Sequence, residues 1–137
     1  MAYALARGLL DAEIPILERH RISMWGYAVL SSLDDQPTRT QAALAEAIGA
    51  DKTRIIPVLE ELQRRGLIDR TPDPADRRAR LLSLTPAGRE LRDAARSEIR
   101  AREDDLLAQV AEPDRESFLR VLRQLSALPR HEIAGAP

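Results

Sequence analysis

Apolar residues recur every three or four positions along most of this chain, with polar and charged residues between them. That period is typical of amphipathic α-helices. Between Gly66 and Thr85 the pattern changes, because two short apolar runs flank a loop rich in arginine and proline. The chain is therefore expected to be mainly α with a small antiparallel β-hairpin (α+β). The expected helices span residues 2–20, 23–33, 40–47, 52–65, 85–111 and 113–129, and the expected strands span residues 67–71 and 80–84.

Residues with strong positional preferences mark the ends of the three central helices. Ser23, Thr40 and Asp51 are predicted N-caps, because their side-chain oxygens can accept a hydrogen bond from a free backbone N–H. Gly49 and Gly66 suit the left-handed conformation that ends many helices. These signals predict a tight turn between the third and fourth helices.

Prolines indicate where the fifth helix begins and where the first helix is interrupted. Thr85 followed by Pro86 is a typical helix start, and Pro15 is expected to kink or divide the first helix. A turn is expected over residues 34–37. The positions expected to face the core are Trp25, Ala28, Val29 and Leu33 in the second helix and Ile55, Ile56, Leu59 and Leu62 in the fourth.

Composition narrows the class of protein. The chain has 137 residues, of which 44% are hydrophobic and 31% charged, as in a globular domain. It has no apolar run of membrane-spanning length and no signal pattern. There is no cysteine, and the two histidines are far apart, so no metal site or other cofactor is expected. We expect a cytoplasmic protein.

The net charge of −1 is unusual for a protein that binds nucleic acid, but the charge is unevenly distributed. Residues 51–92 hold ten Lys or Arg against seven Asp or Glu, whereas each flanking segment has an acidic excess of two. The positive charge is therefore concentrated on the fourth helix and the hairpin.

Three helices followed by a basic hairpin predict a winged helix-turn-helix. In such a fold one helix enters the major groove of DNA while the wing reaches an adjacent groove. Lys52, Thr53 and Arg54 occupy the first turn of the fourth helix, where they can meet base edges and phosphates. The alternative is that they are ordinary surface residues beside a helix cap.

The hairpin loop carries Arg77 and Arg78, and Arg80 follows at the start of the second strand. An arginine suits the negative potential of a narrow minor groove, and Asp76 can hold the Arg78 guanidinium by a bidentate ion pair. The alternative is that these arginines only keep a hairpin soluble.

Several runs of this sequence, in the same order, resemble the MarR family of bacterial and archaeal transcription regulators over about residues 20–95. They are Thr40–Arg54, Leu59–Ile68, Asp73–Arg78 and Leu84–Gly88. The resemblance implies a homodimeric winged-helix protein, usually a repressor, in which helices at both ends of the chain form the dimer. It implies that residues 23–92 form the DNA-binding lobe and that residues 2–20 and 95–129 form the dimerisation helices of a single domain spanning residues 1–129.

The resemblance also assigns roles to residues. Arg78 matches the wing arginine that enters the minor groove, and Asp76 its supporting acid. The full set of DNA-binding candidates is Thr40, Gln41, Lys52, Thr53, Arg54, Asp76, Arg77, Arg78 and Arg80. Two features depart from the family. Pro57 lies inside the DNA-reading helix, where it removes a backbone hydrogen bond, and the lack of cysteine excludes sensing by thiol oxidation.

The terminal helices carry apolar stripes that a small winged-helix core cannot cover. The stripe residues are Leu5, Leu9, Leu107, Phe118, Val121, Leu122 and Leu125. A second copy of the chain is the simplest partner, and the alternative is packing within one chain as a small bundle. The tail over residues 130–137 is expected to be disordered.

The sequence also offers candidate residues for an effector site. In similar proteins aromatic acids bind between the dimer helices and the DNA-binding lobe, and His20, Arg21, Trp25 and Tyr27 lie at that junction. The alternative is that Trp25 is a core residue and His20 a solvated helix end.

The sequence therefore predicts a ligand-responsive or constitutive regulator, a homodimeric repressor of a nearby operon that binds double-stranded DNA at an inverted-repeat operator and is nucleoid-associated when bound. If it responds to a ligand, the candidate effector is a small aromatic or phenolic compound. The alternative is a winged-helix module for protein–protein contact without sequence-specific DNA binding. An enzyme is not expected, because no catalytic or phosphate-binding motif is present.

Overall fold

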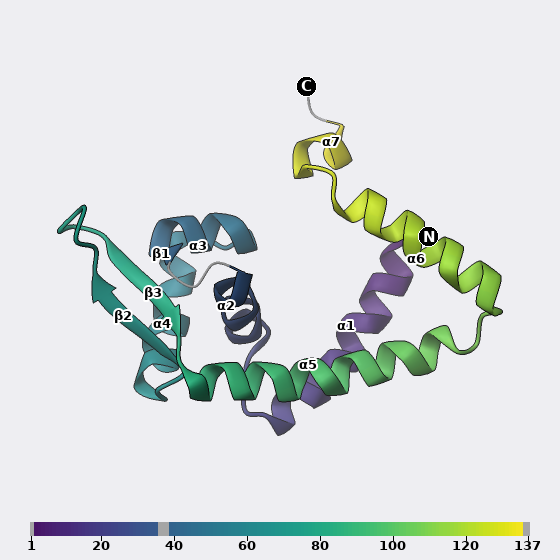
Figure 1. Cartoon of the computed structure of the whole chain (residues 1–137), viewed down its shortest axis with the longest axis horizontal. Coiled ribbons are helices and arrows are strands. Elements are labelled where there is room, and N and C mark those ends of the chain that lie inside the picture. Colours follow the sequence, from purple (N-terminus) through teal and green to yellow (C-terminus); the bar gives the residue numbers. More distant parts are fainter. Residues whose placement is uncertain (1, 36–38, 136–137) are drawn as a thin grey trace. The chain divides into compact units, whose positions relative to one another are not determined.

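The computed structural model describes residues 2–35 and 39–135. They form two compact units, residues 1–99 and residues 100–137. The fold is mainly α with a small antiparallel sheet (Figure 1), as predicted. The elements are α1 (Ala2–Arg19), α2 (Met24–Asp35), β1 (Arg39–Thr40), α3 (Gln41–Ile48), α4 (Lys52–Arg64), β2 (Ile68–Pro72), β3 (Arg80–Leu84), α5 (Pro86–Leu107), α6 (Glu112–Ser126) and α7 (Arg130–Ala134).

The predicted caps of the central helices are present. The hydroxyl of Thr40 accepts a hydrogen bond from the N–H of Ala43, and the carboxylate of Asp51 accepts one from the N–H of Thr53. Ser23 accepts similarly from the N–H of Gly26 at the start of α2. Gly49 ends α3 with a φ of 70°, a conformation that is easy only for glycine. Local side-chain chemistry therefore sets these boundaries.

The wing is the β2–β3 hairpin, which extends away from the helices in Figure 1. Its register pairs Ile68 with Leu84 and Pro72 with Arg80. A third strand, β1, pairs with β3 on its other side and gives the sheet order β1-β3-β2. The sequence analysis missed β1 because two residues are too few to leave a pattern. This strand ties the start of α3 to the wing.

The core of residues 1–99 lies where α2, α3 and α4 meet the inner face of the hairpin. Val29, Leu33, Leu59 and Leu62 are buried there as predicted, with Leu44, Ile68 and Leu82. Two predictions were wrong, since Trp25 and Ile56 are exposed. Both lie at the edge of a helical stripe, where tertiary packing rather than period decides burial.

A close junction joins the end of α4 to the start of α5. The hydroxyl of Thr85 donates to the carbonyl of Gly66 at 2.7 Å and accepts from the N–H of Gly88 at 3.0 Å. The N–H of Thr85 donates to the carbonyl of Leu67 at 3.2 Å. Gly66, which follows α4, has a φ of 72°. The chain therefore enters and leaves the wing at one hydrogen-bonded point.

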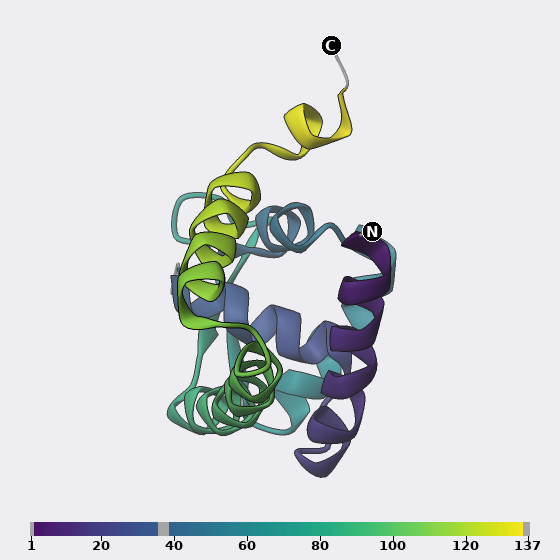
Figure 2. The same cartoon turned by 90° about the vertical axis from the view of Figure 1, so that its right-hand side faces the viewer.

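The C-terminal end of α1 lies beside α5 in both views (Figures 1 and 2). Arg19 pairs with Glu98 at 2.8 Å, and His20 Nε2 lies 3.3 Å from the other oxygen of that carboxylate. The arginine bond is the main reason that the pKa of Glu98 lies below its ordinary value. Pro15 lies inside α1 but does not divide it.

Residues 100–137 contain the end of α5, then α6 and α7. The fifth helix ends at Leu107 rather than near 111, and the last long helix begins at Glu112, beside the predicted Pro113. Residues 130–134 form α7, so the prediction of disorder there was wrong. Pro129 precedes this helix and the left-handed Gly135 ends it, a pairing that stabilises a short helix.

Two further expectations concern the turn over residues 34–37 and the absence of a membrane-spanning helix. Asp34 and Asp35 belong to α2 rather than to a turn, and Gln36 and Pro37 lie outside the described residues. None of the described helices is both long and apolar enough to cross a membrane.

The junction generates the first prediction. A Cβ at Gly88 would overlap the carbonyl oxygen of Leu67, whereas one at Gly8 in α1 would meet nothing within 4 Å. Gly88→Ala is therefore expected to destabilise the protein by about 1–3 kcal/mol. Gly8→Ala, the matched control, should be neutral or stabilising by about 0.5–1 kcal/mol. Urea denaturation at one protein concentration measures both, and equal effects of the two variants would contradict the account.

Candidate nucleic-acid interface

The first turn of α4 presents an exposed polar surface. Lys52, Thr53 and Arg54 are all exposed, while Ile55 behind them is buried in the core. Asp51 caps the turn through the N–H of Thr53 at 2.8 Å and the hydroxyl of Thr53 at 2.7 Å. The core anchors this helix while its N-terminal side chains stay free of it, which is the arrangement required of a groove-reading helix.

The cap also fixes the charge of Asp51. The hydrogen bond from the Thr53 hydroxyl, followed by that from the Thr53 N–H, lowers the pKa of Asp51 below 3.8. The nearby Arg54 charge adds a smaller effect in the same direction. Both bonds favour the ionised carboxylate, which holds the Thr53 side chain in one orientation.

Pro57 lies inside α4 and is its sixth residue. A proline at this position cannot donate to the carbonyl of Thr53. The helix nevertheless continues without a break to Arg64. The carbonyl of Thr53 therefore has no hydrogen bond from residue 57. Thr53 is itself one of the candidate DNA-binding residues.

Two aspartates shape the wing loop. Asp73 accepts a hydrogen bond from the N–H of Ala75 at 2.8 Å, and Asp76 accepts one from the N–H of Arg78 at 3.0 Å. Both are turns in which a side chain bonds the backbone two residues on. The sequence hypothesis placed the Asp76 carboxylate on the Arg78 guanidinium, and that contact is wrong. Asp76 orders the backbone of the loop instead.

The wing arginines are exposed. Arg77 and Arg78 lie in the loop, and Arg80 is the first residue of β3, opposite Pro72. The N–H of Asp73 donates to the carbonyl of Ala79 at 3.1 Å and closes the loop beneath them. Their side chains are therefore carried on an ordered hairpin rather than on a free loop.

The start of α3 contacts the wing sheet through a residue that sequence reasoning missed. Arg70 on β2 donates to the side-chain oxygen of Gln41 at 3.0 Å, and both side chains are half-buried. Thr40, the cap of α3, pairs with Leu81 on β3. No local sequence pattern marks Arg70, because Asp69 and Thr71 flank it in β2. The structure thus brings Thr40 and Gln41 to the base of the wing.

The four effector candidates do not surround one cavity. His20 faces Glu98, and Tyr27 packs against the core. Arg21 has a φ of 55°, and its carbonyl accepts from Arg65 at 2.6 Å. Arg21 lines a cavity of about 170 Å³ beside Pro57, while Trp25 lines a different one of about 320 Å³ beside Arg54. Among the described residues no group of His, Asp or Glu is placed to hold a metal ion.

Known proteins similar to this chain are transcription regulators. A family model described as the MarR family matches residues 22–79. The transcriptional regulator HosA of Escherichia coli O111:H- is 31% identical over 72% of this chain and 73% of its own. The PcaV regulator of Streptomyces coelicolor, solved with its natural ligand, is 30% identical with a TM-score of 0.69 over 89% of each chain. The repressor CouR, bound to a DNA duplex, is 28% identical with a TM-score of 0.77 over 92% of each chain.

The Asp51 cap generates a pH prediction. A pKa that is lowered in the folded state provides stability above pH 3.8, and that stability is lost as the pH falls through the lower folded value. A ¹³C NMR titration of the Asp51 carboxyl should therefore have a midpoint below 3.8. Thr53→Val removes the hydroxyl donor and keeps the backbone N–H, so it should move the midpoint upward. Identical midpoints in both proteins would refute the assigned cause.

Proposed function

Because this chain belongs to the MarR family, and is therefore a transcription regulator and not an enzyme, we propose that it binds an inverted-repeat operator as a homodimer and represses a nearby operon. The winged fold and the family resemblance were both predicted from the sequence and are confirmed. The inverted-repeat operator, the homodimer, and repression rather than activation are proposals.

The first turn of α4 carries the proposal. Lys52, Thr53 and Arg54 stand exposed on a helix whose other face is anchored in the core. This helix leads directly into an ordered wing that exposes Arg77 and Arg78. A helix with polar side chains at its N-terminus suits the major groove, and an arginine on a wing suits the minor groove.

The dimer is supported by apolar side chains that each unit leaves exposed. On α6 these are Phe118, Val121, Leu122 and Leu125, which follow one helical stripe, and on α1 they include Leu5, Leu10 and Ile14. Leu125 is 56% exposed. A contiguous apolar stripe on a charged helix is typical of an interface. A second copy of the chain presents the same stripes and can bury them by two-fold symmetry.

Repression and an effector are supported by named relatives. NicR of Pseudomonas putida is described as a transcriptional repressor and is 37% identical over 50% of this chain. PcaV has been solved with a natural ligand. For this chain we propose the same kind of control, with a small aromatic or phenolic compound as the effector that releases the DNA.

The alternative function, a winged-helix module that meets an acidic protein, uses the same arginines. A gel-shift assay with the intergenic DNA upstream of the chain's own gene separates the two. Sequence-specific retention that survives excess random DNA supports the operator. Retention equal on cognate and random DNA favours the protein-contact alternative.

Substitutions separate helix from wing. Arg54→Ala is expected to cost roughly 1–3 kcal/mol on the cognate site and much less on random DNA, because a bidentate guanine contact is base-specific. Arg78→Ala should weaken binding to all DNA and make the salt slope of log K shallower by about one unit per wing. Titrations on cognate and scrambled duplexes at several salt concentrations measure both effects. An unchanged affinity for Arg78→Ala would mean that the wing is only a solvated hairpin.

Asp76 provides the control for the wing. Asp76→Ala loses the acceptor for the N–H of Arg78 and should weaken binding, whereas Asp76→Asn keeps that acceptor and removes a negative charge close to DNA. The asparagine variant is therefore expected to bind at least as tightly as the wild type. Equal losses of DNA affinity in both variants would contradict this account. They would indicate instead that the Asp76 carboxylate pairs with the Arg78 guanidinium.

The apolar stripe predicts the assembly. Replacing Leu122 and Leu125 with Glu would bury charge in an apolar seam and should dissociate the dimer. Ile133→Glu on α7, where the side chain is 63% exposed and outside the stripe, is the matched control and should remain dimeric. Sedimentation equilibrium at micromolar concentration measures all three proteins. A monomeric wild type would sink the proposed assembly.

A further inference from the structure

The exposed face of α4 changes from polar to apolar after its first turn. Thr53, Ile56 and Pro57 are spaced three and four residues apart, so they lie on one side of the helix. All three residues are exposed. Ile55 and Leu59, on the opposite side, are buried in the core. Two apolar side chains therefore lie next to Thr53 on the surface that we propose meets DNA.

Ile56 is 37% exposed, although the helical period of α4 predicts a core position for it. Val58, two residues further on, does pack against the core. Single exposed apolar residues are common on protein surfaces, so the position of Ile56 matters more than its exposure. It lies one turn behind Thr53 on a helix whose N-terminal residues are the ones that meet base edges in a winged fold.

The Thr53 hydroxyl is already used within the protein. It donates to the Asp51 carboxylate at 2.7 Å, and the same carboxylate oxygen accepts from the N–H of Thr53 at 2.8 Å. Because the hydroxyl hydrogen is committed to Asp51, it cannot be donated to a base. The methyl group of Thr53 needs no such partner and adds to the apolar surface that begins at Ile56.

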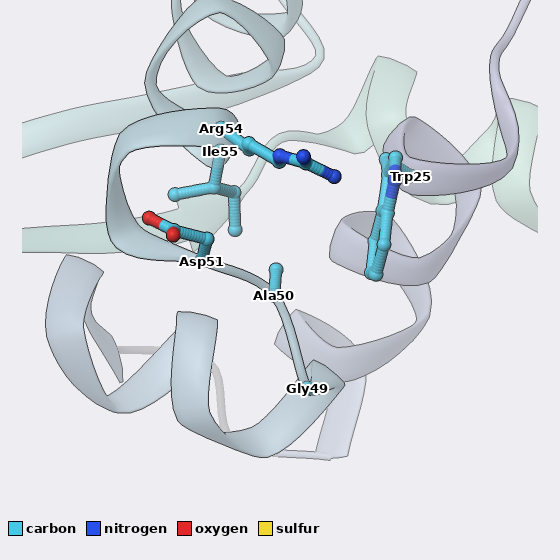
Figure 3. Close-up of a pocket in the computed structure, with 6 residues that line it drawn as sticks. All are labelled: Trp25, Gly49, Ala50, Asp51, Arg54 and Ile55. Atoms are coloured by element: carbon cyan, nitrogen blue, oxygen red, sulfur yellow. The ribbon is translucent and has the colours of Figure 1, made fainter.

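Arg54 lies on a different side of α4. In Figure 3 its side chain extends toward the Trp25 indole on α2. Residues 54 and 56 are about 200° apart around a helix with 3.6 residues per turn, so the cation does not cover Ile56. Glu60, exposed on the next turn of the Ile56 side, would repel phosphates. The apolar surface is therefore short and confined to the first two turns of the helix.

We propose that Ile56, together with the methyl group of Thr53, contacts the 5-methyl groups of thymines in the major groove. This inference rests on the proposed binding of operator DNA by α4. Thymine is the only one of the four bases that presents a methyl group at the major-groove edge. Ile56 is then a specificity-determining residue that favours thymine by apolar contact, in addition to the hydrogen bonds proposed for Arg54.

The test removes one methyl group at a time from the DNA. Each thymine of the cognate duplex found by gel shift is replaced in turn by deoxyuridine, which pairs with adenine in the same way but lacks the methyl group. Fluorescence anisotropy measures the affinity of the wild type, Ile56→Ala and Thr53→Ser for each duplex. The serine keeps the hydroxyl that bonds Asp51 and removes only the methyl group. Gln63→Ala, exposed on the last turn of α4, is the matched control.

The wild type is expected to lose about fourfold in affinity at a contacted thymine in each half-site, the effect of one buried methyl group. Ile56→Ala should bind the unmodified duplex more weakly and should no longer respond to deoxyuridine at that thymine. Thr53→Ser should respond less at the same or the adjacent thymine. Gln63→Ala should match the wild type at every position. All four proteins should bind a scrambled duplex equally, which also reports that each is folded.

Three outcomes would contradict the inference, and they separate it from the proposed function. A wild type that prefers the cognate duplex but binds every deoxyuridine duplex equally well would overturn the thymine contact and leave operator binding intact. A response to deoxyuridine that persists in Ile56→Ala would also overturn it, because the methyl group would then act through DNA shape or another residue. Equal binding of the wild type to cognate and scrambled duplexes would refute the proposed function, and the thymine contact with it.

Discussion

The hydroxyl of Thr85 connects the end of α4 to the start of α5, and the position of the wing depends on this contact. It donates to the carbonyl of Gly66, which follows α4, and accepts from the N–H of Gly88 in the first turn of α5. The chain enters β2 just after Gly66 and leaves β3 just before Thr85, so both ends of the wing lie at this contact. Only a residue without a Cβ fits at Gly88. The orientation of the wing relative to α4 is therefore set by a few short hydrogen bonds. A change of one side chain there would alter the spacing between the two elements that we propose contact DNA, without itself touching DNA.

Order in the binding surface comes from the backbone rather than from burial. Asp51 fixes the first turn of α4, and Asp73 and Asp76 fix the wing loop. Each of these carboxylates bonds a backbone N–H two residues further on. The arginines beside them stay exposed and retain their full charge for phosphates and base edges. Acidic residues in the proposed DNA-binding surface thus reduce its net charge but limit the conformational freedom lost on binding.

Short-range signals allowed much of the fold to be predicted from the sequence. Thr40 and Asp51 are correct as caps because capping depends on a few adjacent residues. Trp25 was misplaced because a helical period defines a stripe, while packing by other segments decides where the stripe ends. The spacing of Asp76 and Arg78 fits both an ion pair and a side-chain-to-backbone turn, and only the geometry distinguishes them. The contact of Arg70 with Gln41 joins residues distant in sequence, so no local pattern could reveal it.

The central claim is that one protomer meets DNA at two places, with α4 in a major groove and the wing in the adjacent minor groove. Hydroxyl-radical footprinting of the wild type and Arg78→Ala on the operator tests this most directly. The account predicts two symmetric protected half-sites centred roughly 10 bp apart. Each should be flanked by minor-groove protection that disappears in Arg78→Ala while the central protection remains. A single asymmetric footprint, or flanks that persist in the variant, would contradict it.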